Sequence, residues 1–178
     1  NSGCKQQSSH NRRYGIQLLN QTRARTIELR SLLKQAAWNA KGHDLVLLQA
    51  LFVTMATELD VHSDLLAERL VVLGGVAGAT GVPQPMQPRS PGLSMDGDTY
   101  VRMLAEQFTP YATALRADIA HATEVEDAGS AALFTDISRA VDKRLGFLEA
   151  YLHRDGARPE AAGHDGRQAV GHDGRQAE

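Results

Sequence analysis

The chain has 178 residues and a formal net charge of −2. That length allows one domain with a substantial core and is too short for two domains of ordinary size. The near balance of charge gives no strong indication of a nucleic-acid, membrane or acidic partner. Aromatic residues make up only 5% of the chain, while Ala and Leu are plentiful, which favours a helical bundle over a sheet.

The single cysteine, Cys4, excludes a disulfide bond within the chain and makes a reducing compartment the default expectation. No apolar run reaches the length that a transmembrane helix needs, and no signal peptide is visible. We therefore expect a cytoplasmic protein with no membrane partner, and association with the nucleoid is left open.

Residues 1–15 are polar and predict a flexible N-terminal arm. The charged residues of this arm are Lys5, Arg12 and Arg13, with no acidic residue among them. These three residues are candidates for DNA binding through the phosphates, although one arm alone supplies few contacts. An oligomer would multiply the contacts, because every subunit contributes an arm. A solvated tail is the alternative interpretation.

The folded part is expected over residues 16–153, beginning with a helix from about Ile16 to Ala40. Gly42 is a plausible left-handed cap at a tight corner, and Asp44 can serve as the N-cap of a second, long helix that ends at residues 74–75. Apolar side chains recur along this second helix at steps of three and four, with one gap of seven, which predicts a continuous buried stripe. The stripe consists of Leu45, Leu48, Phe52, Met55, Leu59, Leu66, Leu70 and Leu73.

Residues 76–97 are rich in Gly and Pro and cannot hold a long helix, so they are expected to form a long crossover. A third helix is predicted to begin near Asp96 or Asp98 and to bend at Pro110, where one backbone hydrogen bond is lost. After a break at residues 124–129, a fourth helix is predicted over residues 130–152. A long crossover between the second and third helices is typical of ferritin-like bundles. The fold class is therefore expected to be all-α, a ferritin-like four-helix bundle.

Residues 154–178 form a polar tail that ends in a tandem octad, GHDGRQAV at 163–170 and GHDGRQAE at 171–178. Two hydrophilic copies are too few to build a solenoid. The His and Asp side chains of the repeat could bind a metal loosely, but a Gly-rich segment loses much entropy on ordering. The composition favours disorder.

Two segments carry a specific family pattern: LLNQTRARTIELRSLLKQAAWNAKG at 18–42 and LQALFVTMATELDVHSDLLAERLVVLGG at 48–75. Together with the ending LFTDISRAVDKRLGFLEAYL at 133–152, they resemble the Dps family of mini-ferritins. The resemblance implies a hollow homo-dodecamer that oxidises Fe(II), preferably with hydrogen peroxide, and stores the ferric mineral in its cavity. Many members of the family also bind and compact DNA non-specifically.

The resemblance also assigns five iron ligands to positions of this chain. The family takes two His and one Asp from the first two helices of one subunit, and this chain has Ala37, Gln49 and Val53 at those positions. An Asp and a Glu in a D-x-x-x-E pattern come from the neighbouring subunit, and Asp64 and Glu68 match them. Iron(II) sites need several imidazole and carboxylate donors. The ferroxidase centre is therefore expected to be degraded, with iron weak or absent there and no catalytic residue assigned.

Asp64 and Glu68 remain the candidate metal ligands, because carboxylates one helical turn apart can share a cation. The alternative is that they form ion pairs with arginines across the subunit interface, for example Arg30 or Arg69. The sequence favours this alternative slightly, since the lost ligands are mostly replaced by apolar residues.

The family cage has acidic threefold pores near the start of the last helix. Candidates for that role are Glu124, Glu126, Asp127 and Asp136, because rings of carboxylates concentrate cations. Acidic residues at helix N-termini are also common because of the helix dipole alone.

Taken together, the chain is expected to form a Dps-like mini-ferritin cage for iron sequestration and DNA protection under oxidative or starvation stress, with a degraded ferroxidase centre. The alternative is a structural, DNA-associating cage with no iron-oxidising activity. The surviving Asp64 and Glu68 favour the first function, and the three lost ligands favour the second.

Overall fold

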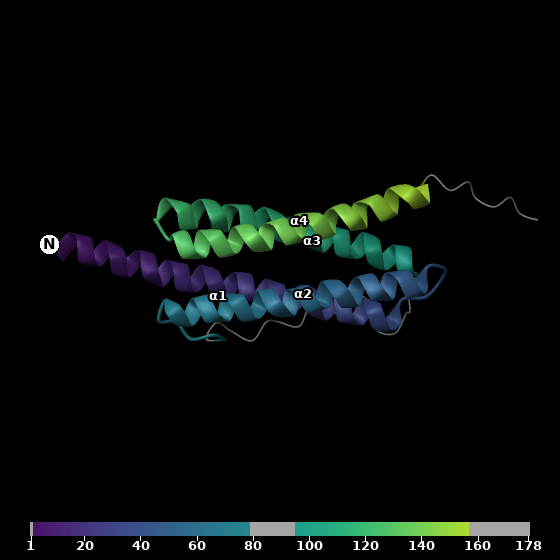
Figure 1. Ribbon diagram of the computed structural model, residues 1–178, viewed down its shortest axis with the longest axis horizontal. Coiled ribbons are helices and arrows are strands. Elements are labelled where there is room, and N and C mark those ends of the chain that lie inside the picture. Colours follow the sequence, from purple (N-terminus) through teal and green to yellow (C-terminus); the bar gives the residue numbers. More distant parts are fainter. Residues whose placement is uncertain (1, 79–94, 157–178) are drawn as a thin grey trace, which may run out of the picture.

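The computed structural model describes residues 2–78 and 95–156. Four helices occupy these ranges: α1 (Ser2–Asn39), α2 (Leu45–Val72), α3 (Gly97–Glu124) and α4 (Ala128–Gly156). Figure 1 shows α1 with α2 as one antiparallel hairpin and α3 with α4 as another, the two lying along each other. The prediction of an all-α four-helix bundle is confirmed.

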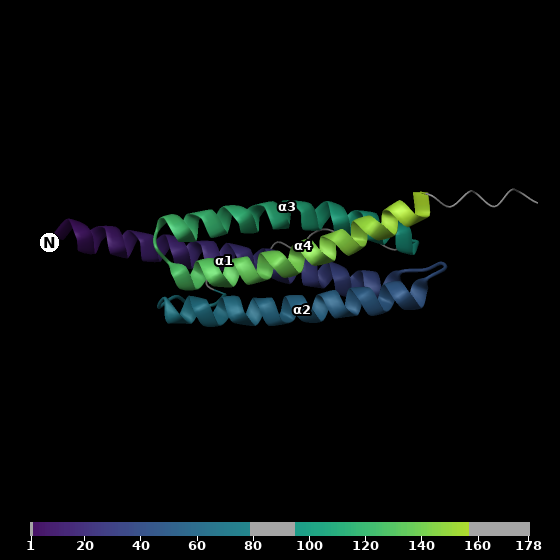
Figure 2. The same ribbon diagram turned by 45° about the horizontal axis from the view of Figure 1, so that its top comes forward.

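The connection between α2 and α3 is a long crossover, as predicted. Both helices run in the same direction along the bundle (Figures 1 and 2), so the chain must return from one end to the other between them. Residues 79–94 of the connection lie outside the described part. Where the chain reappears, the Lys41 amide donates to the Met95 carbonyl at 3.2 Å and the Gly97 amide donates to the Lys41 carbonyl at 2.9 Å. These bonds fix the start of α3 against the corner between α1 and α2.

Local sequence explains most of the helix ends. Gly42 has a φ of 108°, a value that favours glycine, and it allows the tight corner after α1. Asp96 caps α3 by accepting a hydrogen bond from the Thr99 amide at 2.7 Å. Asp44 stands at the N-cap of α2 as predicted, but its φ is 58° and its side chain makes no capping hydrogen bond. The cap of α2 is therefore weaker than the sequence suggested.

The N-terminal segment differs from its prediction. The helix α1 begins at Ser2 rather than near Ile16, so the segment predicted to be a flexible arm is the first part of this helix. In Figure 1 the purple end of α1 projects past the ends of the other three helices. The base of this extension is held by the Tyr14 ring, which lies 4.1 Å from the ring of His121 on α3. At the other end of the chain, the predicted polar tail lies mostly outside the described residues.

The core consists of the apolar faces of all four helices. Six of the eight residues in the predicted stripe of α2 are buried, while Leu45 and Leu73 are partly buried against the core. Pro110 lies within α3 without ending it. The largest fully buried side chains include Phe52, Phe108, Phe134, Leu19, Leu33, Leu66 and Leu115.

The helix α2 carries more apolar surface than its buried stripe requires. Among the described helices, α2 is the one that is long and apolar enough to cross a membrane by length and composition alone. The sequence had been expected to contain no apolar run of that length. This is weak evidence for a membrane span, because core helices of soluble proteins pass the same test. The excess apolar surface lies on the outer face of α2, where valines are exposed.

Candidate functional site at the outer face of α1 and α2

The outer face of α2 is apolar over much of its length. Val46 is 81% exposed, Val53 55% and Val61 54%. The hydroxyls of Thr54 and Thr57 bond within the helix, to the carbonyl oxygens of Ala50 at 2.8 Å and of Val53 at 2.9 Å. Because these threonines direct their donors to the backbone, the part of the face from residue 46 to residue 57 offers mainly methyl groups to whatever covers it.

The three positions that the family fills with iron ligands lie at different depths. Ala37 on α1 is 5% exposed and belongs to the core, Gln49 is half-buried, and Val53 points outward. None of these side chains carries a negative charge or an imidazole nitrogen. In the described part of the chain, no group of three or more His, Cys, Asp or Glu side chains could hold a metal ion. The donor set of a single chain therefore does not fit a two-iron centre.

Asp64 and Glu68 are both exposed on α2. They share the outer face of that helix with Val53 and Val61, because residues three, four, seven and eight apart lie near one another on a helix. Within the described residues, neither carboxylate has an ion-pair partner. Their negative charges are thus available to a second molecule.

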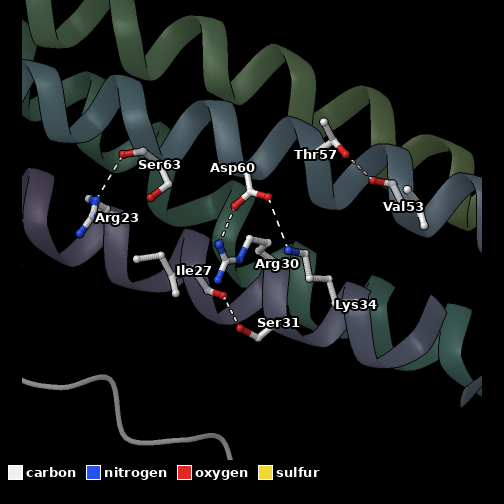
Figure 3. Close-up of polar contacts among 9 residues, drawn as sticks. All are labelled: Arg23, Ile27, Arg30, Ser31, Lys34, Val53, Thr57, Asp60 and Ser63. Carbon is white, nitrogen blue, oxygen red and sulfur yellow. Dashed lines mark hydrogen bonds and ion pairs between the residues drawn. The ribbon is translucent and has the colours of Figure 1, made fainter. Parts of the chain in front are cut away.

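The arginines proposed as alternative partners are already engaged within the chain. Arg30 donates from Nη1 to Oδ1 of Asp60 at 2.6 Å, and the Lys34 ammonium lies 3.8 Å from the other oxygen of Asp60 (Figure 3). Arg69 donates to Oδ1 of Asp127 at 2.5 Å. Within a single chain, Arg30 and Arg69 therefore neutralise carboxylates other than Asp64 and Glu68.

Asp127, a candidate pore residue, has a structural role at the start of α4. Its Oδ1 accepts from the Ser130 amide at 3.0 Å and its Oδ2 accepts from the Ser130 hydroxyl at 2.6 Å. Burial would raise the pKa of Asp127, but the bonds from Ser130 and Arg69 outweigh it and lower that pKa. Asp127 is thus an N-cap that also joins α4 to α2 through Arg69.

The remaining pore candidates are more open. Glu124 and Glu126 are exposed beside the turn between α3 and α4, and Glu126 has a φ of 59°. Asp136 is exposed further along α4, with Arg139 at 3.7 Å. The structure therefore brings Glu124 and Glu126 to one end of the bundle and leaves Asp136 apart from them.

The candidate DNA-binding residues lie on the projecting part of α1. Arg12 and Arg13 are exposed there, whereas the side chain of Lys5 lies outside the described part. Both arginines are thus presented by a helix rather than by an extended arm.

Sequence reasoning missed a polar contact between α2 and α4. Arg144 donates from Nε to one oxygen of Glu58 at 2.7 Å and from Nη2 to the other. His62 lies one turn from Glu58 and is largely buried, with its Nδ1 enclosed and unpaired. Burial lowers the pKa of His62, although the charge of Glu58 opposes that shift. The spacing of Glu58 and His62 was visible in the sequence, but their partner on α4 was not.

A second missed set of polar contacts joins α1 to α3. The Thr22 hydroxyl donates to Oδ2 of Asp118 at 2.6 Å, and the hydroxyls of Thr26 and Tyr111 lie 2.7 Å apart. Burial raises the pKa of Asp118 and raises that of Tyr111 to about 12. These contacts hold the two hairpins together and lie away from the outer face of α2.

The fold and its family matches define the class of the protein. A family model described as a ferritin-like domain matches residues 16–156, so this is a ferritin-like four-helix protein. The DNA protection during starvation protein of Agrobacterium fabrum is 36% identical over 142 residues, which cover 77% of this chain and 86% of that protein. The chain belongs to the Dps family.

Solved structures give the same result. The Dps protein of Vibrio cholerae, described as a member of a superfamily of ferritin-like diiron-carboxylate proteins, superposes with a TM-score of 0.72 at 26% identity. That match covers 80% of this chain and 91% of the other. DpsC of Streptomyces coelicolor superposes with a TM-score of 0.73 at 28% identity, over 80% and 86% of the two chains.

Proposed function

We propose that the chain assembles into a hollow homo-dodecamer that sequesters iron and protects DNA under oxidative or starvation stress. The relatives named for DNA protection support the biological role. The exposed apolar face of α2 supports the assembly, because valines such as Val46 and Val53 are stabilised when another surface covers them. We also propose a cytoplasmic location, which leaves association with the nucleoid open.

We further infer that the ferroxidase centre is degraded. The observation that carries this inference is the donor set: Ala37 is packed in the core, Val53 is aliphatic and Gln49 is neutral. Asp64 and Glu68 of a neighbouring subunit would supply only two carboxylates, which suffices for weak binding of one hard cation with water in its other positions. Iron would then enter as cargo without a site that prepares two ions for oxidation.

The test is the rate of Fe(II) oxidation by hydrogen peroxide on the purified assembly, followed by absorbance. The reference is the variant Ala37→His, Gln49→His, Val53→Asp, which restores the family donors. We expect slow oxidation by the natural sequence and faster oxidation by the restored one. Equal, fast rates would show that iron is oxidised at another site. The buried position of Ala37 makes a thermal melt of the variant a necessary control.

The second candidate function is a structural, DNA-associating cage with no iron-oxidising activity. The same three positions favour it, since none offers an anionic donor. The two functions differ in mineral content after slow aerobic loading with Fe(II): a storage cage retains iron through gel filtration, and a structural cage elutes without it. Glu124 and Glu126 are proposed to attract cations at the pore, so Glu124→Gln with Glu126→Gln should slow any uptake.

DNA binding is proposed to use Arg12 and Arg13, with Lys5, on the projecting helix. These charges are few per subunit, and an assembly repeats them. Replacing Arg12 and Arg13 by Ala should weaken binding to duplexes of any sequence and reduce its salt dependence. Retention in a gel-shift assay at low and moderate salt measures both effects. Unchanged binding by the variant would place the DNA contacts elsewhere.

A further inference from the structure

The middle of the outer face contains as many positive as negative side chains. Three carboxylates lie along α2, Asp60, Asp64 and Glu68, and three cations lie along the facing side of α1, Arg23, Arg30 and Lys34. Figure 3 shows the three cations beside Asp60 and Ser63. Arg23 donates to the Ser63 carbonyl at 3.3 Å rather than to an acid. The face is therefore electrically balanced without a metal ion, although its charges are only partly paired.

Lys34 makes the weaker of the two ion pairs on Asp60. Asp60 is already neutralised by Arg30 at 2.6 Å, and the Lys34 ammonium lies 3.8 Å away with 43% of its side chain exposed. Lys34 also lies three residues before Ala37, so the two residues are on the same side of α1 in neighbouring turns. The ammonium can therefore turn toward a new carboxylate with little loss inside its own subunit.

Asp64 and Glu68 require such a partner once the face is covered. A carboxylate transferred from water onto the methyl groups of Val53 and Val61 is destabilised unless a positive charge accompanies it. Arg30 and Arg69 are held by Asp60 and Asp127 of their own chain. Of the two cations that remain on this face, Arg23 and Lys34, Lys34 lies nearer along α1 to Ala37, one of the lost ligand positions.

We propose that the Lys34 ammonium forms an ion pair with Asp64 or Glu68 of a second copy of this chain, so that assembly across this face needs no metal ion. The inference rests on the proposed cage and specifies how its interface works. In an isologous contact every pair occurs twice, since each copy offers both Lys34 and the carboxylates. Removing one type of side chain therefore removes two ion pairs from each interface.

The experiment is sedimentation velocity of the full chain over a range of concentrations, with and without EDTA. The variants are Lys34→Glu, Asp64→Lys with Glu68→Lys, and the combination of all three changes. Lys34→Gln provides a milder change, because Lys34→Glu also places a negative charge near Asp60. Arg116→Glu is the control: it reverses an exposed charge that pairs with Asp142 across α3 and α4.

We expect EDTA to leave assembly of the natural sequence unchanged. Lys34→Glu should raise the concentration needed for assembly by about tenfold or more, Lys34→Gln by less, and the combined variant should recover much of the loss. Helix content and thermal melts show whether each subunit is folded. Dissociation by EDTA would overturn the proposed ion pair, and so would assembly of folded Lys34→Glu at the same concentration as the unaltered chain. Either result would leave the proposal of a cage standing. A natural chain that stays monomeric would overturn the cage as well.

Discussion

The guanidinium of Arg144 on α4 binds the carboxylate of Glu58 on α2 through two nitrogen atoms. The two residues are 86 positions apart, so this contact joins the hairpins rather than neighbouring turns. A second arginine, Arg69, makes a similar connection from α2 to Asp127 and Ser130. Two arginine contacts therefore fasten α2 to α4, while hydroxyl contacts fasten α1 to α3.

Glu58→Gln should reduce the dependence of stability on acid pH. The hydrogen bond from Arg144 lowers the pKa of Glu58 below its ordinary value of 4.5. A carboxyl group with a lowered folded-state pKa stabilises the fold above its unfolded pKa, and this contribution is lost as pH falls through the folded value. Because the Glu58 side chain is about a third exposed, we expect a contribution of about 1 kcal/mol. Urea unfolding at neutral pH and below pH 4.5 measures it.

If the natural sequence and Glu58→Gln lose the same stability on acidification, the acid sensitivity arises elsewhere. Asp142→Asn is the matched control, because Asp142 pairs with Arg116 at an exposed position between α3 and α4. Its effect should be smaller than that of Glu58→Gln, since water screens exposed pairs.

As the pH falls, protonation of His62 should begin to destabilise the fold at a higher pH than protonation of Glu58 does. Burial lowers its pKa below the ordinary 6.5, so the folded state prefers the neutral imidazole. Stability from this group is present above the unfolded pKa and declines as pH falls below 6.5 toward the folded value. The charges around the ring are those of Glu58 on α2 and Arg144 on α4. An NMR titration of His62 that gave a pKa at or above 6.5 would contradict this reading.

Asp127→Ala should destabilise the protein by about 1–2 kcal/mol, because it removes both the cap of α4 and the partner of Arg69. Glu126→Gln at the adjacent position should change stability little, since Glu126 is exposed. Denaturant unfolding of the two variants separates a structural role from a pore role. A stable Asp127→Ala with slower iron uptake would assign Asp127 to the pore instead.

Periodic features were predictable from the sequence, and contacts between distant segments were not. The stripe from Leu48 to Leu70 predicted α2 correctly, because burial follows helical spacing. The start of α1 was misplaced, since polar residues before Ile16 obscure a helix that continues past the core. The Asp127 cap was open to prediction from its residue type, because Asp is favoured at N-cap positions, but the fourth helix was predicted to begin at residue 130. The pairing of Glu58 with Arg144 depends on which helix faces meet, and no local pattern specifies that.

The candidate site was predictable only in part. The exposure of Asp64 and Glu68 follows from their place opposite the buried stripe, and their spacing identified them as a pair. The engagement of Arg30 by Asp60 could not be read from the sequence, because it depends on how closely α1 and α2 approach. That contact changes the interpretation, since it leaves Lys34 rather than Arg30 as the loosely held cation.

Gly146→Ala should stabilise α4 by about 0.5–1 kcal/mol. A Cβ added at Gly146 would meet no atom within 4 Å, and alanine restricts the unfolded chain more than glycine does. Gly129→Ala is an informative comparison in the same helix, because its Cβ would lie 2.7 Å from the Arg69 guanidinium. Arg69 is held there by Asp127 and Ser130, so moving it weakens both bonds and should cancel the gain. Thermal unfolding of both variants measures the difference; an equal rise in Tm would mean that Arg69 shifts freely, and that its bond to Asp127 contributes little to the contact between α2 and α4.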